Sequence, residues 1–122
     1  MARFTTGPIF NPAVAGVRNT QTLTVLIDNQ NASQSSSVLI EGYFLNGTRT
    51  LYVQELVQLA PNQVVRRNYF AAFEGYEFVF NTSGPAADNI EISAWGKNAA
   101  GELVTAHRVV AEELVEDELL SL

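Results

Sequence analysis

The side chains that could carry out chemistry in this chain are few and scattered. It has one histidine, His107, no cysteine, and 13 acidic residues among 122. Nucleophilic catalysis needs a hydroxyl or thiol beside a base that a third group orients. On a predicted strand the neighbours Ala106 and Arg108 point away from His107, and no Gly-x-Ser-x-Gly motif occurs. We therefore interpret His107 as a partly buried structural residue and expect no enzymatic activity.

Paired carboxylates are the other route to acid–base chemistry. The candidates on predicted strands are Glu41, Glu55, Glu77 and Glu91. Folding could bring two of them together, but their spacing singles out no pair, so solvated strand faces are the simpler interpretation. The acidic cluster at residues 112–118 lacks the Asp-x-Asp-x-Asp-Gly order of a calcium loop, and no glycine-rich phosphate loop occurs. We expect neither a metal nor a cofactor.

The charge of the chain lies mostly at its end. The formal net charge is −6, and residues 109–122 hold five acids and no base. Arg66 and Arg67 are the only adjacent bases and would point to opposite faces of a strand, so we expect no nucleic-acid partner. No apolar run is long enough to span a membrane, and Gly7-Pro8 with Asn11-Pro12 would interrupt the core of a signal peptide.

Residues 20–110 alternate apolar and polar side chains with a period of two. Leu23, Val25 and Ile27, for example, alternate with polar neighbours, which is typical of a strand buried on one face. Turn residues interrupt the pattern at short intervals, so about seven strands fit. The sequence predicts an all-β fold, a single antiparallel β-sandwich of seven to eight strands, and leaves immunoglobulin-like and jelly-roll topologies open.

Two local features of this region make specific predictions. Asn46-Gly47 lies between alternating runs and favours a two-residue turn with positive φ at both positions, so a hairpin should join strands ending near Leu45 and starting near Thr48. Glu55 falls among the apolar residues of the second of these strands. A β-bulge or a position at the edge of the sheet would explain it.

The flanks differ from the β region, and we expect three parts: an extended N-terminal arm (1–19), a β-sandwich core (20–110) and an acidic C-terminal tail (111–122). The arm has only two charged residues and is too apolar for a solvated tail. With one lysine in the chain, the sheet edges are poorly guarded, so the arm could add as a strand to a neighbouring copy. Alternatively, it folds back over its own sandwich. The expected interface residues are Phe4, Ile9, Phe10, Val14 and Val17.

Three aromatic residues suggest a second kind of contact. Alternation places Trp95, Tyr43 and Tyr52 on outward faces. Exposed aromatic rings can stack on sugars or form a protein contact, whereas both faces of a central strand can also be covered. We therefore keep a surface glycan as a candidate partner beside simple packing.

Three segments carry a resemblance to a known group of proteins. They are Thr24-Val25-Leu26-Ile27-Asp28-Asn29, Leu59-Ala60-Pro61-Asn62-Gln63, and Ser93-Ala94-Trp95-Gly96-Lys97 followed by Gly101-Glu102-Leu103-Val104. Together they resemble small all-β surface proteins of spore-forming Gram-positive bacteria, similar in plan to the jelly-roll subunits of endospore appendages. In those subunits an N-terminal connector precedes a β core. Their connectors carry cross-linking cysteines, and this chain has none, so any assembly would depend on burial and strand pairing.

From these observations we expect a non-enzymatic structural subunit. It would assemble as a homo-oligomer or polymer, an extracellular filament or a lattice at the cell or spore surface, by N-terminal strand addition and without a classical signal peptide. The alternative is a carbohydrate-binding or adhesive β-sandwich module.

Overall fold

The structure, a computed structural model, describes residues 2–109 and 115–116, and almost all of its regular structure is β-strand. The longer strands are β5 (Thr22–Asn29), β6 (Ser36–Leu45), β7 (Arg49–Leu59), β8 (Val64–Phe70), β9 (Gly75–Ser83), β10 (Ile90–Lys97) and β11 (Leu103–Val109). The shorter elements are β1 (Ala2–Thr5), β2 (Ile9–Phe10), β3 (Ala13–Val14), β4 (Val17–Arg18), β12 (Val115–Glu116) and a 3-10 turn, η1 (Ala87–Asn89). Every strand pair is antiparallel, which confirms the predicted all-β, antiparallel class. In this part of the chain no helix could cross a membrane.

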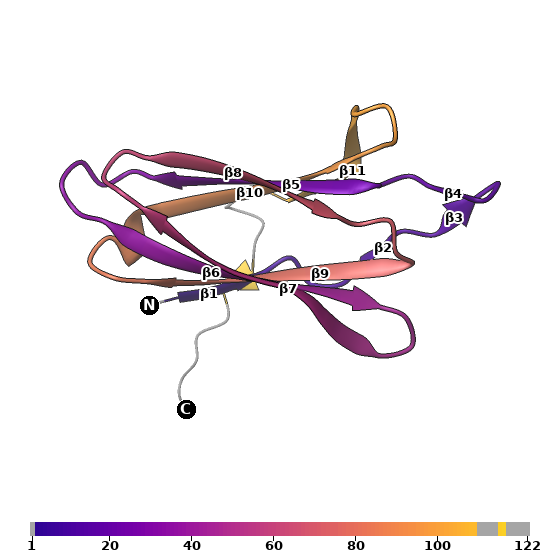
Figure 1. Cartoon of the computed structure of the whole chain (residues 1–122), viewed down its shortest axis with the longest axis horizontal. Helices are drawn as coiled ribbons and strands as arrows, with labels where there is room; N and C mark the ends of the chain where they lie inside the picture. The colour runs from indigo at the N-terminus through magenta and orange to yellow at the C-terminus, as the bar shows by residue number, and fades with distance from the viewer. Residues whose placement is uncertain (1, 110–114, 117–122) are drawn as a thin grey trace.

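Two main sheets lie face to face (Figure 1). The first has the order β12-β1-β9-β6-β7, with β2 also paired to β9, and the second has the order β11-β10-β5-β8. A third, two-stranded sheet consists of β3 and β4 and projects from one end of the two layers (Figure 1). The described residues thus form three sheets, whereas the sequence predicted a single sandwich.

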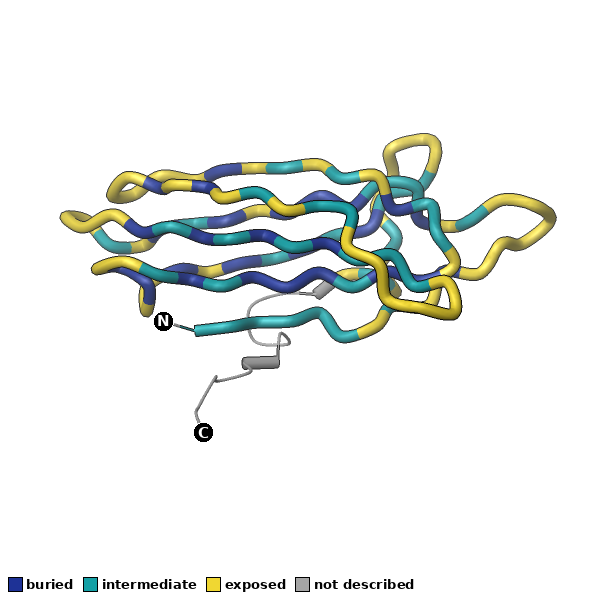
Figure 2. Tube along the Cα trace, turned by 60° about the horizontal axis from the view of Figure 1, so that its bottom comes forward, coloured by how far each residue is buried: buried dark blue, intermediate teal, exposed yellow. Residues whose placement is uncertain are grey.

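The core fills the space between the two main sheets. Alternate residues of most strands point into it, so buried positions alternate with intermediate or exposed ones while the loops at both ends are largely exposed (Figure 2). The largest fully buried side chains are Tyr76, Phe78 and Phe80 of β9. Leu23, Val25 and Ile27 of β5 are fully buried and belong to the same core, as their alternation predicted.

The hairpin predicted at Asn46-Gly47 is present, but its loop differs from the prediction. Strands β6 and β7 pair in antiparallel fashion, and the last pair is Leu45 with Arg49, which leaves three residues in the loop. Gly47 has φ +78°, whereas Asn46 is not among the described residues with positive φ. The two-residue turn is therefore wrong, because a three-residue loop needs the left-handed conformation at only one position.

Glu55 lies on β7, the edge strand of the first sheet. The edge position, one of the two explanations predicted for this residue, is therefore confirmed. Its carboxylate accepts hydrogen bonds from the Tyr69 hydroxyl (2.6 Å) and from Nε of Arg67 (2.8 Å), both on β8 of the other sheet. These two bonds, Tyr69 first, hold the pKa of Glu55 below its ordinary value. Inward-pointing charge discourages another strand from adding to an edge, so the β7 and β8 edges are better guarded than their lack of lysine suggested.

The structure corrects the expected extended arm at residues 1–19. β1 and β2 pair with β9 of the same chain, with Phe4 opposite Phe80 and Ile9 opposite Tyr76. Without them β9 would leave backbone groups unpaired and its aromatic side chains less covered. Residues 2–10 thus complete a sheet edge, and residues 12–19 project. Of the expected acidic tail, only β12 lies within the described residues, paired with β1.

The close approach of β6 to β9 gives a test of this packing. A Cβ atom added at Gly42 would lie 2.6 Å from Cε2 of Phe78 and 3.1 Å from Cβ of Val53. We expect Gly42→Ala to lower the free energy of unfolding by about 1–3 kcal/mol, because a fully buried ring would have to shift. Urea unfolding measures this loss. Glu41→Ala, one residue away and on the outer face, is the control, and an equal loss in both variants would contradict the packing described.

Candidate functional site

The segment between β2 and β5 projects from one end of the molecule (Figure 1). β3 and β4 form a hairpin with the pairs Ala13–Arg18 and Val14–Val17. Its turn is Ala15-Gly16, and both residues have positive φ, 52° and 81°. The side chains of Val14 and Val17 are 66% and 57% exposed. The hairpin therefore presents apolar surface to solvent and is held by a short ladder.

The base of the projecting segment is fixed by a fully buried asparagine. Nδ2 of Asn11 donates to the carbonyl oxygens of Thr20 (2.9 Å), Ala71 (3.1 Å) and Phe73 (3.1 Å). Its Oδ1 accepts from the backbone N–H of Thr20 at 3.1 Å. Asn11 and Thr20 thus close the segment at its two ends, and a buried side chain with this many partners is costly to replace.

His107 lies beside this base, in a small cluster with two hydroxyl groups. Its Nδ1 is 2.5 Å from Oγ1 of Thr20 and 3.2 Å from the hydroxyl of Tyr76. Burial lowers the pKa of His107, and a hydrogen bond with the Phe10 backbone opposes this more weakly. Burial also raises the pKa of Tyr76 to about 12. His107 is partly buried, as expected, and both hydroxyl groups approach the same ring nitrogen, Nδ1.

The backbone of β10 approaches this cluster closely. A Cβ atom at Gly96 would lie 2.5 Å from Oγ1 of Thr20 and 2.9 Å from Cβ of His107. β11 has a register shift opposite the step from Trp95 to Gly96. The glycine and the irregular register together let His107 reach Thr20.

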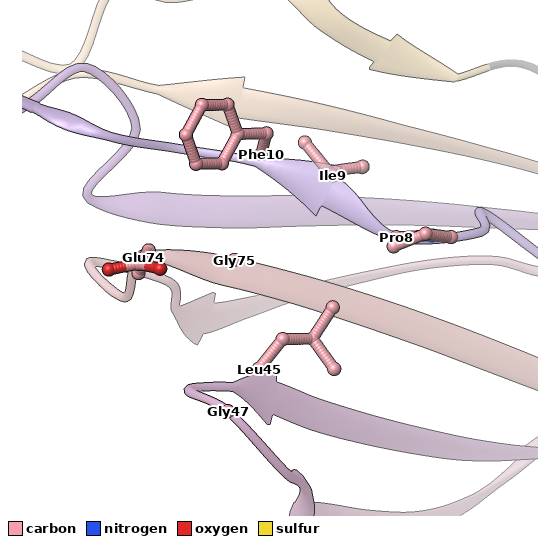
Figure 3. Close-up of a pocket in the computed structure, with 7 residues that line it drawn as sticks. All are labelled: Pro8, Ile9, Phe10, Leu45, Gly47, Glu74 and Gly75. Carbon is pink, nitrogen blue, oxygen red and sulfur yellow. The ribbon is translucent and has the colours of Figure 1, made fainter.

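A pocket of about 370 Å³ lies next to the base of the hairpin. Figure 3 shows its lining residues, which come from the segment around β2, the β6–β7 turn and the start of β9: Pro8, Ile9, Phe10, Leu45, Gly47, Glu74 and Gly75. The lining is mostly apolar, and Glu74 is its acidic residue. Phe10, at its rim, is 69% exposed. This end of the molecule therefore combines a projecting apolar hairpin with a hollow.

The five predicted interface residues fall into two groups. Phe4 and Ile9 are partly buried and pack against the core of their own chain. Phe10, Val14 and Val17 are exposed and lie in or beside the projecting segment. The structure therefore brings only the second group to a surface that another molecule could reach directly.

The three aromatic residues considered for a glycan do not share a face. Trp95 is on the outer side of the second sheet, with the Arg108 guanidinium 5.2 Å from its ring centre. Tyr43 is on the outer side of the first sheet, with Arg49 at 3.5 Å. The outward placement of Tyr52 is wrong: its ring packs on Phe73 and its hydroxyl donates to the carbonyl of Phe70. A register shift between Gly42 and Tyr43 turns this residue toward the core.

The carboxylates considered for catalysis have separate partners. The partners of Glu55 are described above. The Glu77 carboxylate accepts hydrogen bonds from Nε of Arg49 (3.1 Å) and from the Thr5 hydroxyl (3.0 Å). Glu41 accepts from Nε2 of Gln54 at 3.2 Å. Among the described residues no three His, Asp or Glu side chains are grouped so that they could hold a metal ion.

Sequence reasoning missed Asn11 and Thr20 as the residues that fix the N-terminal segment. In the sequence, Asn11 stands out only as part of Asn11-Pro12, which would interrupt a signal-peptide helix. The signal in the sequence is that Asn11, a polar residue, directly follows the apolar pair Ile9-Phe10 in a segment with few charges. Its partners, the carbonyls of Ala71 and Phe73, are backbone groups about 60 positions away, which no side-chain pattern reveals.

Comparison with known proteins supports the fold and identifies no family. No family model and no curated protein matches the chain. Among solved structures, it is similar to the crystal structure of Thermotoga maritima 1070, with a TM-score of 0.54 and 9% sequence identity. The match covers 95% of this chain and 90% of that chain. At this identity the likeness shows the fold alone.

The lowered pKa of His107 predicts how stability depends on pH. The unfolded chain binds a proton near the ordinary histidine pKa of about 6.5, whereas the folded protein binds it at lower pH. The free energy of unfolding should therefore be highest above about pH 6.5 and fall as the pH decreases toward the folded pKa.

Urea unfolding between about pH 5 and pH 8 measures this dependence, with His107→Gln as the control. The difference between parent and variant isolates the histidine from the titrating carboxylates. A difference that stays constant over this range, or that grows in favour of the parent at acid pH, would contradict the prediction.

Proposed function

We propose that the protein is a non-enzymatic structural subunit that associates with copies of itself through its N-terminal segment. In this proposal the two facing sheets form one β-sandwich that serves as a rigid body, and a polymer or lattice results when subunits join. The resemblance to appendage subunits supports a place at the cell or spore surface.

The observation that carries the proposal is the apolar surface of the projecting segment. Phe10, Val14 and Val17 are each more than half exposed, although burying such a side chain fully stabilises a protein by about 1.5–3 kcal/mol. The hairpin that carries two of them lies outside both main sheets and contributes nothing to the core. Large apolar side chains exposed close together in sequence, on a projecting segment, are a feature that protein contacts use.

The arrangement of the aromatic residues favours this function over the glycan-binding alternative. Sugar-binding surfaces need rings that are exposed together, whereas Trp95 and Tyr43 are on opposite outer faces and Tyr52 packs inward. Trp95 and Tyr43 each face outward with an arginine over the ring, so this alternative could use either ring alone but not the two together.

Replacement of the exposed apolar residues tests self-association. We expect the triple variant Phe10→Ser, Val14→Ser, Val17→Ser to form fewer or no large assemblies, because the contact loses its apolar surface. Light scattering over a concentration series and negative-stain electron microscopy measure this. Since these side chains are outside the core, the free energy of unfolding should change little.

The matched control is Val64→Ser. Val64 is 55% exposed and pairs with Asp28, at the end of β5 farthest from the hairpin. It should leave assembly unchanged. A parent protein that remains monomeric at all concentrations, or a triple variant that assembles like the parent, would refute the proposed function.

A further inference from the structure

The N-terminal strand is held by contacts that any copy of the chain could supply. The backbone N–H of Ala2 donates to Oγ1 of Thr82 (3.2 Å), and the backbone N–H of Thr6 donates to the carbonyl of Phe78 (3.0 Å). The backbone N–H of Asn11 donates to the carbonyl of Glu74 at 2.7 Å. These acceptors lie on or just before β9, so β9 of a neighbouring copy offers the same partners in the same register.

The projecting segment has the properties of a hinge. Asn11 and Thr20 are buried at its ends, and residues 12–19 between them form the β3–β4 hairpin with two residue pairs. Type I′ turns need positive φ at both central residues and favour Asn-Gly, whereas this turn has Ala15-Gly16. An alanine in the left-handed region shifts the equilibrium between the closed and the open hairpin toward the open form by roughly fivefold or more. Opening the hairpin removes that strain.

The hinge is also long enough. Nine peptide steps separate Asn11 from Thr20, which is roughly 30 Å when extended. A domain of this size has a radius of gyration of about 14 Å, so the extended segment spans about one domain width. An opened hinge therefore reaches β9 of a copy whose body touches the donor.

We propose that residues 2–11 are exchanged between copies: each subunit opens its β3–β4 hairpin and places its own β1 and β2 on β9 of the next subunit. This inference rests on the proposed function and names its partner as a second copy of the chain. The exchanged strand makes the contacts of the closed form, so exchange is opposed mainly by the entropy of association and favoured by relief of the strained turn. Donation in one direction does not close and produces a linear polymer.

Disulfide trapping tests the exchange directly, because the natural chain has no cysteine. Arg3 of β1 is the partner of Asn81 in β9, and both side chains are half-buried. Arg3→Cys and Asn81→Cys are made in separate full-length chains, one with a size tag. The two proteins are mixed, or co-refolded from urea, and then oxidised. We expect a disulfide-linked pair of one tagged and one untagged chain on a non-reducing gel.

The control pair is Arg3→Cys with Glu91→Cys, since Glu91 is exposed on the second sheet. A mixed 3–81 product no more abundant than the 3–91 product overturns the exchange. If the parent still assembles by light scattering in that case, the exchange fails and the proposed function stands. If the parent is monomeric throughout, the proposed function fails as well.

The hinge turn supplies two variants with opposite expected effects. Ala15→Asn creates the favoured Asn-Gly turn, so it should lower the yield of the mixed 3–81 product by about fivefold. Gly16→Val should raise the yield, because a β-branched residue disfavours φ +81° while its Cβ meets no atom within 4 Å. Yields that are the same in both variants would show that the hairpin is not the hinge.

Discussion

Hydrogen bonding on both sides of β9 is the constraint on which the structure depends. This strand pairs with β6 on one side and with β1 and β2 on the other. Its inward face supplies Tyr76, Phe78 and Phe80, the bulkiest fully buried side chains of the molecule. Without β1 and β2, this strand would lie at an open edge with unpaired backbone groups, and an N-terminal strand satisfies those groups. The closed form satisfies this need within one chain, and the exchange proposed above would satisfy it between chains.

Much of the fold could be predicted because one physical rule governs it. Alternation along residues 20–110 reflects strands buried on one face, and β5 to β11 follow it over most of their described length, except at the register shifts in β6–β7 and β10–β11. The rule is local, so it placed Leu23, Val25 and Ile27 correctly without knowledge of any partner. It also marked Glu55 as an exception, and that residue proved to lie on an edge strand with Arg67 and Tyr69 of the facing sheet as partners.

The rest could not be predicted, because it depends on groups far apart in the sequence. Tyr52 alternates like an outward residue, but a register shift opposite Gly42 turns it inward. Asn11 fixes the N-terminal segment through backbone carbonyls near residue 72, and backbone groups leave no mark in the composition. The apolar character of residues 1–19 predicted burial against another surface, and Phe4 and Ile9 are partly buried against the core while Phe10, Val14 and Val17 are exposed. It could not indicate that β9 of the same chain covers β1 and β2.

The two sides of the first sheet have different consequences for how such a molecule could grow. On the β9 side, the short strands β1 and β2 pair with β9, and a hairpin with a strained turn connects them to the rest of the chain. On the β7 side, Glu55 and Arg67 face inward and are bonded across the gap between the sheets. Under the exchange proposed above, the β9 side of the subunit would join copies, and the guarded β7 side would not. That asymmetry would allow a line of subunits to lengthen without thickening sideways into a mat.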